Sequence, residues 1–165
     1  MAQFFSLPFV RLGLKVAGIT FLLDQAHKLF MIFVYGIEAK GRVTVLPFFD
    51  WVYVINKGVS FGSFSGDSMR WQIALALFAA VVAAALTLWL GKGVDNKLLA
   101  ASVGLLIGGA LGNALDRLIH GGVADFFLLH AFGYSWYVFN IADVAIVAGV
   151  IGLLYDQWRE RGVRA

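Results

Sequence analysis

Two aspartates beside long apolar segments are the residues in this sequence best suited to catalysis. Asp125 follows an apolar run that contains Asn113, Asp116 and Arg117, and Asp143 stands near the start of the next run. Charged side chains in membrane-length segments are costly and usually functional. Two carboxylates held close cannot both ionise easily, so one keeps a proton. The charged one can accept a proton from water while the other protonates a leaving amine, which predicts an aspartyl-protease pair.

Separate structural roles for the same two acids are the alternative explanation. Asn140 is a plausible helix N-cap, and Asp143 stands three residues later, as in a capping box. Asp125 would then be a charge at the membrane surface. The residue types alone leave both interpretations open.

The composition indicates a polytopic membrane protein. Of the 165 residues, 61% are hydrophobic and only 14% are charged, whereas soluble domains have about 45–50% apolar residues. The net charge of +3 gives no reason to expect a nucleic-acid partner. Because there is no cysteine, disulfides, thiol nucleophiles and thiolate metal sites are excluded.

We predict a mainly α-helical membrane fold, in which residues 1–165 form a single domain. Apolar runs of membrane length predict four transmembrane helices, at about 16–35, 71–90, 98–115 and 139–158. β-Branched and aromatic residues over about 43–63 predict a small extracytoplasmic antiparallel β-sheet between helices 1 and 2. We expect residues 117–138 to form an interfacial connection.

Two patterns within the helices predict close packing. Asp24 and Lys28 are four residues apart, so they share a helix face and can pair; such a pair commonly fixes packing. Gly104, Gly108 and Gly112 form a small-residue stripe, which is typical of helices that approach closely in lipid.

Basic residues near the helix ends predict the orientation. The basic residues of the short 91–97 loop and of the C-terminal tail count most, because charges close to the ends of transmembrane helices dominate topology. We therefore expect both termini to be cytoplasmic, with the 36–70 segment and the Asp125/Asp143 region on the outer face. The basic residues expected inside are Arg11, Lys15, Lys92, Lys97, Arg159, Arg161 and Arg164.

Other catalytic chemistries have weaker support. The stretch Gly58-Val-Ser60-Phe-Gly62 matches the G-x-S-x-G pattern of serine hydrolases, but its surroundings predict a hairpin rather than a strand–turn–helix. The three histidines lack the close spacing of a zinc site, so we predict no metal.

Four ordered motifs resemble those of the lipoprotein signal peptidases, also called signal peptidase II, over most of the chain. They are Asp24-Gln25-x-x-Lys28, Asn56-x-Gly58-x-x-Phe61-Gly62, Gly112-Asn113-x-x-Asp116-Arg117 followed by Val123-x-Asp125-Phe126, and Phe139-Asn140-x-Ala142-Asp143. The chain departs from the usual pattern at Val59 and Ser60 and at Tyr137, where the family often has proline.

The resemblance implies an aspartyl endopeptidase of the bacterial inner membrane that needs no metal or cofactor. It would cleave prolipoproteins just before a diacylglyceryl-modified cysteine, and globomycin-type peptides would inhibit it. Membrane lipid is the other expected partner. Asp125 and Asp143 match the catalytic dyad. The residues that match substrate-binding or supporting positions are Asp24, Lys28, Asn56, Gly58, Asn113, Asp116, Arg117 and Asn140.

Two rival functions use the same polar residues. A small proton-coupled transporter would use the acids as a relay. A non-catalytic scaffold would use them for packing, and replacing Asp125 and Asp143 would then leave its function intact.

Overall fold

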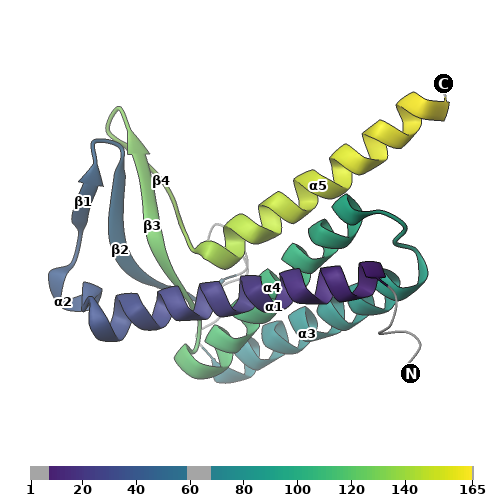
Figure 1. Cartoon of the computed structure of the whole chain (residues 1–165). Helices are drawn as coiled ribbons and strands as arrows, with labels where there is room; N and C mark the ends of the chain where they lie inside the picture. The colour runs from purple at the N-terminus through teal and green to yellow at the C-terminus, as the bar shows by residue number, and fades with distance from the viewer. Residues whose placement is uncertain (1–7, 59–67, 165) are drawn as a thin grey trace.

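A computed structural model describes residues 8–58 and 68–164, with side chains to residue 159. Within these residues, four helices are long and apolar enough to cross a membrane. They run roughly side by side as a bundle, with a sheet at one end (Figure 1). The helices are α1 (Pro8–Leu29), which continues as the π-helical turn η2 (Phe30–Val34), α3 (Met69–Lys92), α4 (Lys97–His120) and α5 (Ile141–Arg164).

The helix bounds differ from those expected. The first helix begins at Pro8 rather than near residue 16, since proline is tolerated in a first turn. The third continues to His120 rather than ending near 115, because Asp116 and Arg117 beyond that point find hydrogen-bond partners inside the protein. It ends at Gly121, whose φ of 68° permits a left-handed cap. The fourth begins at Ile141 rather than 139, since Phe139 belongs to a strand.

The antiparallel sheet is confirmed, but half of its strands come from an unexpected place. Strands β1 (Val43–Leu46) and β2 (Phe49–Asn56) precede α3, whereas β3 (Val123–Ala131) and β4 (Tyr134–Phe139) lie between α4 and α5. The spatial order is β1-β2-β3-β4. The prediction of an interfacial connection at 117–138 misses these two strands, although the segment has the same β-branched and aromatic character as the earlier one. A short helix, α2 (Ile37–Lys40), connects η2 to β1.

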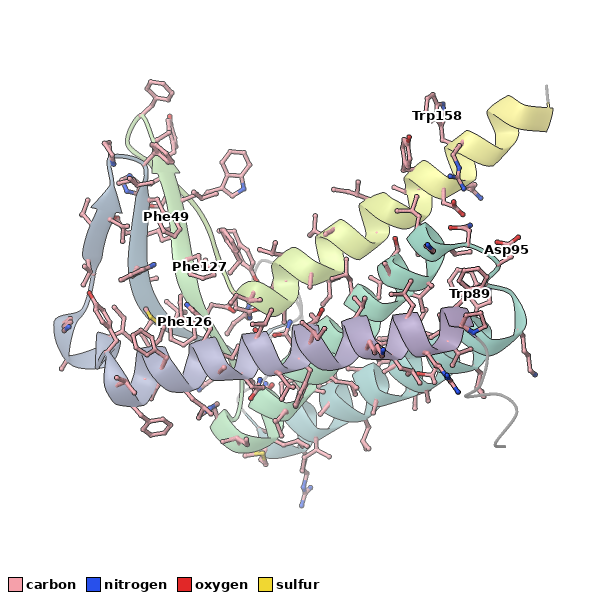
Figure 2. The ribbon with its side chains drawn as sticks, viewed as in Figure 1. Phe49, Trp89, Asp95, Phe126, Phe127 and Trp158 are labelled. Atoms are coloured by element: carbon pink, nitrogen blue, oxygen red, sulfur yellow. The ribbon has the colours of Figure 1, made fainter. Side chains whose placement is uncertain are left out.

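Aromatic packing fixes the sheet on the end of α1. Phe126 is fully buried with Met31 and Ile37, and its ring lies 5.4 Å from that of His27. Phe127, on the opposite face of the strand, has its ring 5.8 Å from that of Phe49 (Figure 2). Because the two residues that follow Asp125 in the chain are held in this way, β3 has a fixed position relative to the bundle.

The glycine stripe of α4 allows it to approach α1. A Cβ atom at Gly104 would lie 2.4 Å from the carbonyl oxygen of Gly13, and one at Gly108 would lie 2.5 Å from that of Ala17. At Gly112 it would lie 2.6 Å from the Asp24 carboxylate. The packing role expected for these glycines is confirmed, and the approach brings the polar residues of α1 and α4 together.

Gly108→Ala should therefore lower the free energy of unfolding. The added methyl group would push against the backbone of α1, and such overpacking typically costs about 1–3 kcal/mol. Gly18→Ala is the matched control, because a Cβ atom there meets nothing within 4 Å. Thermal melting of both variants in detergent tests this, and equal melting temperatures would contradict the close packing.

Candidate active site

The first turn of α5 forms the predicted capping box. The backbone N–H of Asp143 donates to Asn140 Oδ1 at 2.9 Å, and the backbone N–H of Asn140 donates to Asp143 Oδ2 at 3.3 Å. Asn113 of α4 donates from Nδ2 to the other carboxylate oxygen of Asp143 at 2.8 Å. The Asp143 carboxylate is therefore held both by its own helix and by α4.

Asp125 lies near the start of β3, an inner strand of the sheet, and reaches the same place. It pairs with Val54 of β2 in the strand register and is almost fully buried. Asn140 Nδ2 donates to Asp125 Oδ1 at 2.7 Å, and Asn56 Nδ2 donates to Oδ2 at 3.2 Å. Asn140 thus contacts both aspartates, which are distant in the sequence and come from different elements.

Burial and the neighbouring charge of Asp143 raise the pKa of Asp125 to about 7. Hydrogen bonds from Asn140 and Asn56 and the charge of Lys28 act in the opposite direction, but they are outweighed. A carboxyl group with such a pKa carries a proton in a large fraction of molecules near neutral pH. This is the condition that an acid–base pair needs.

A buried ionic cluster lies directly behind the two aspartates. Lys28 Nζ is 2.7 Å from Asp24 Oδ2 and 2.7 Å from Asp116 Oδ2, and all three side chains are almost completely buried. Backbone N–H groups complete the cluster, since Ala142 donates to Asp24 at 2.9 Å and Ala124 donates to Asp116 at 3.0 Å. The cluster therefore connects α1, α4, β3 and α5.

Arg117 is adjacent to Asp116 in the sequence but is not the cation that pairs with it. That cation is Lys28. Arg117 donates instead to two carbonyl oxygens, those of Asn113 at 3.0 Å and Gly58 at 3.1 Å. The reason is helical geometry, because adjacent residues of a helix do not face each other. Arg117 thus ties the end of α4 to the segment that follows β2.

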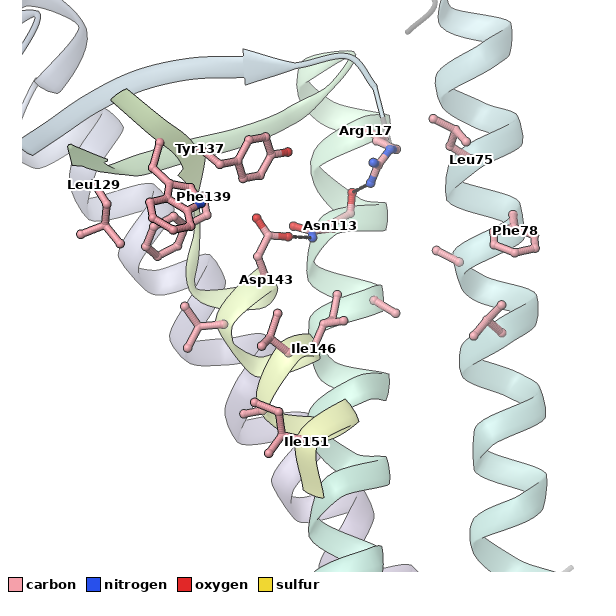
Figure 3. Close-up of a pocket in the computed structure, with 17 residues that line it drawn as sticks. Leu75, Phe78, Asn113, Arg117, Leu129, Tyr137, Phe139, Asp143, Ile146 and Ile151 are labelled. Carbon is pink, nitrogen blue, oxygen red and sulfur yellow. Dashed lines mark hydrogen bonds between the residues drawn. The ribbon is translucent and has the colours of Figure 1, made fainter. Parts of the chain in front are cut away.

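A cavity of about 850 Å³ opens beside Asp143, between α3, α5 and the sheet. Apolar residues such as Leu75, Phe78 and Ile151 form most of its wall, whereas the polar side chains gather at one end (Figure 3). This end is formed by Asn113, Arg117, Tyr137 and Asp143. Asp125 lies behind this wall, in contact with Asn140.

Two residues at the site were not among the candidates. Gln25 Nε2 donates to Asp24 at 3.1 Å and to Asp116 at 3.1 Å, so it joins the ionic cluster. Asn56 Nδ2, which binds Asp125, also donates to the hydroxyl oxygen of Tyr137 at 2.6 Å. Gln25 stood within the first motif, so its position was a usable signal. Tyr137 departs from the family pattern, so no signal in the sequence marked it as part of the site.

Tyr137→Phe should lower kcat about threefold to tenfold, with a smaller effect on KM. The variant leaves Asn56 without one acceptor, and a single hydrogen bond is worth about 0.5–1.5 kcal/mol. Because Asn56 binds Asp125, the pH dependence of kcat should shift as well. Tyr134→Phe is the control, since Tyr134 lies on the same strand with an exposed side chain. If the two variants have identical pH–rate profiles, Tyr137 does not position the site.

The remaining candidates are placed as follows. The backbone N–H of Gly58 donates to Asn56 Oδ1 at 3.0 Å, which orients the Asn56 amide. Ser60, Phe61 and Gly62 lie outside the described residues, and so does most of the hairpin expected at 58–62. Within residues 8–58 and 68–159, no group of three or more histidine or acidic side chains could hold a metal ion.

Comparison with known proteins places this arrangement in a family. The family model described as signal peptidase (SPase) II matches residues 16–159. A lipoprotein signal peptidase of Rhodopseudomonas palustris is 50% identical over 152 residues, covering 90% of this chain and 92% of the relative. One of Methylocella silvestris is 49% identical over 148 residues, covering 88% and 85%.

A solved structure agrees with this assignment. It is described as a bacterial membrane enzyme structure determined by the in meso method at 2.3 Å resolution. It superimposes with a TM-score of 0.79 at 26% identity, covering 93% of this chain and 91% of the solved chain. The chain therefore belongs to the signal peptidase II family and is a multi-pass membrane aspartyl protease.

Proposed function

We propose that this enzyme removes signal peptides from prolipoproteins whose cysteine already carries diacylglycerol, cleaving just before that cysteine. The observation that carries the proposal is the contact of Asn140 with both Asp125 and Asp143, beside a largely apolar cavity. Two carboxylates at one asparagine provide acid–base chemistry. The apolar wall suits a substrate that arrives with acyl chains from within the bilayer.

In the proposed reaction, the aspartate pair holds one proton. The charged carboxylate takes a proton from a water molecule, and the oxygen of that water attacks the peptide carbonyl carbon. The protonated carboxyl then gives its proton to the nitrogen of the cysteine as the C–N bond breaks. The products are the free carboxyl end of the signal peptide and the amino group of the lipidated cysteine. Asn113 and Asn140 keep both acids oriented during these steps.

The test is cleavage of a synthetic lipobox peptide by the purified enzyme, followed by mass analysis. The diacylglyceryl-modified peptide should be cut immediately before the modified cysteine, and the same peptide without the lipid should not. A chelator should leave the rate unchanged, and globomycin should lower it. Equal cleavage of both peptides would contradict the lipid requirement, and loss of turnover in EDTA would reveal a metal.

We also propose that the enzyme lies in the inner membrane with both termini in the cytoplasm. The sheet and the site lie at the end of the bundle opposite the α3–α4 loop (Figure 1). In the cysteine-free chain, Val94→Cys in this loop should resist a membrane-impermeant thiol reagent in intact cells. Glu38→Cys in α2 should react. The opposite labelling pattern would reverse the orientation.

A further inference from the structure

The end of the sheet farthest from the helices exposes a group of apolar side chains. The turns β1–β2 and β3–β4 both lie at this end (Figure 1). We name residues 45–48 and 131–136 the sheet tip. It contains no charged residue. Its exposed apolar side chains are those of Val45, Leu46, Phe48, Phe132, Tyr134 and Trp136.

Phe132 has an unfavourable backbone conformation that packing of its side chain within the described residues does not offset. It has a φ of 52°, and Gly133 has a φ of 81°. Positive φ at both positions of a two-residue hairpin turn strongly favours Asn-Gly, because the left-handed region is sterically unfavourable for most residues with a Cβ atom. Yet the side chain of Phe132 is 99% exposed and gains almost nothing from packing. An unfavourable backbone that supports an exposed ring points to a contact outside the chain.

The sheet tip is continuous with the lipid-facing surface of the bundle. Leu129 and Trp136 line the same cavity as Val144, Val147 and Ile151 of α5. These three α5 residues lie in a membrane-spanning segment, and Val144, Val147 and Ile151 are all largely exposed. Strand β4 leads directly into the start of α5 (Figure 1). One apolar surface therefore runs from the lipid-exposed side of α5 to the tip.

The charged groups nearest the tip are neutralised by one another. Asp50 is fully buried, is bonded to the Arg42 side chain, and has His130 Nε2 3.0 Å away. Burial would raise the pKa of Asp50, but hydrogen bonds from Arg42, Thr44 and His130 outweigh it and lower the pKa. Asp50 thus presents no free anion at the surface that would oppose contact with lipid headgroups.

We propose that the sheet tip is a membrane anchor that inserts into the lipid–water interface beside the cavity. Its occupant is the phospholipid bilayer rather than a protein. Tryptophan and tyrosine favour the headgroup level, and phenylalanine favours the acyl boundary. Tyr134 and Trp136 are 82% and 78% exposed beside Phe132. The anchor would hold the sheet close to the bilayer surface from which a lipidated substrate enters.

Collision measurements on spin-labelled protein in phospholipid nanodiscs test the anchor directly. Single labels at Phe132→Cys, Ile151→Cys and Glu38→Cys report the tip, a lipid-facing reference and a water-facing reference. The ratio of collisions with oxygen to collisions with a water-soluble nickel complex should be high at 132, as at 151, and low at 38. A ratio at 132 equal to that at 38 would overturn the proposal. Shielding from both reagents would indicate a protein partner or a second copy and would also overturn it.

Asparagine at the turn provides an independent test. Phe132→Asn should raise the melting temperature in detergent, because asparagine tolerates positive φ and no packing is lost. Phe48→Asn is the matched control, since Phe48 is also exposed but has no positive φ. In nanodiscs of brominated lipid, quenching of the chain's tryptophan fluorescence should fall in Trp136→Phe. A marked loss of stability in Phe132→Asn, or unchanged quenching in Trp136→Phe, would contradict the anchor.

Discussion

Replacing either Asp125 or Asp143 with asparagine is expected to lower the rate of lipopeptide cleavage by about 10²–10⁴-fold. This is the usual contribution of a positioned general acid or base. Each substitution removes one half of the proton transfer but keeps the size of the side chain. The measurement is kcat with the diacylglyceryl peptide. Asp156→Asn, at the opposite end of α5, is a control that changes a buried acid outside the site. Near-normal turnover in either dyad variant would show that the pair is not catalytic.

Asp125→Asn is also expected to change how the stability of the protein depends on pH. The pKa of Asp125 is about 7 in the folded protein against an ordinary 3.8. A raised folded pKa means that ionisation disfavours the folded state, with no effect below about pH 4 and the full effect above about pH 7. Each pKa unit corresponds to about 1.4 kcal/mol. The melting temperature of the parent should therefore fall relative to that of Asp125→Asn as the pH rises from 5 to 8.

Hydrogen bonding limits how much stability Asp125→Asn gains. The asparagine oxygen can still accept from Asn140, but its NH₂ group would face the NH₂ group of Asn56. A protonated aspartate meets the same difficulty, so parent and variant should melt alike near pH 4, where ionisation does not yet destabilise the parent. At neutral pH we expect the variant to be equal or more stable. A large loss of stability at pH 8 in both Asp→Asn variants would show that the acids are structural partners.

Lys28→Met is expected to destabilise the protein more than any other single substitution at the site. It would leave the carboxylates of Asp24 and Asp116 buried without their cation, and breaking a buried pair typically costs about 3–5 kcal/mol. Thermal or denaturant unfolding in detergent measures this. Lys15→Met is the control, because Lys15 lies on the same helix with an exposed side chain.

A compensated variant separates lost charge pairing from lost packing. Adding Asp24→Asn and Asp116→Asn to Lys28→Met removes the uncompensated charges, so part of the lost stability should return. Arg117→Ala should cost less than Lys28→Met, because Arg117 contacts two carbonyl oxygens and its loss strands no carboxylate. If Lys28→Met melts like Lys15→Met, the cluster contributes nothing to folding.

Local sequence signals predicted the elements that bear the site but not all of their partners. The four apolar helices, the antiparallel sheet, the Asp24–Lys28 pair and the Asn140–Asp143 capping box all follow from composition or spacing. The capping box succeeds because it involves residues three apart on one helix. Strands β3 and β4 were missed because their aromatic residues were interpreted as a sign of the membrane interface. The same residues also favour strands.

Contacts between distant segments could not be predicted from spacing. Lys28 rather than Arg117 faces Asp116, which depends on how α1 and α4 are rotated against each other. Tyr137 of β4 reaches Asn56 of β2 across the intervening strand β3, because both side chains lie on the same face of the sheet. Such choices are set by packing over the whole bundle.

The capping box has a consequence for the stage of chain synthesis at which the site is completed. Asn140 and Asp143 belong to the last helix to be made, whereas Asp125 and the ionic cluster around Lys28 come from earlier segments. A nascent chain that has inserted only α1, α3 and α4 lacks one carboxylate and the asparagine that bridges the pair. Proteolytic capacity should therefore appear in a single step, when α5 enters the membrane and its first turn winds up. Under the proposed mechanism, a chain that still lacks α5 should therefore be unable to cut substrates.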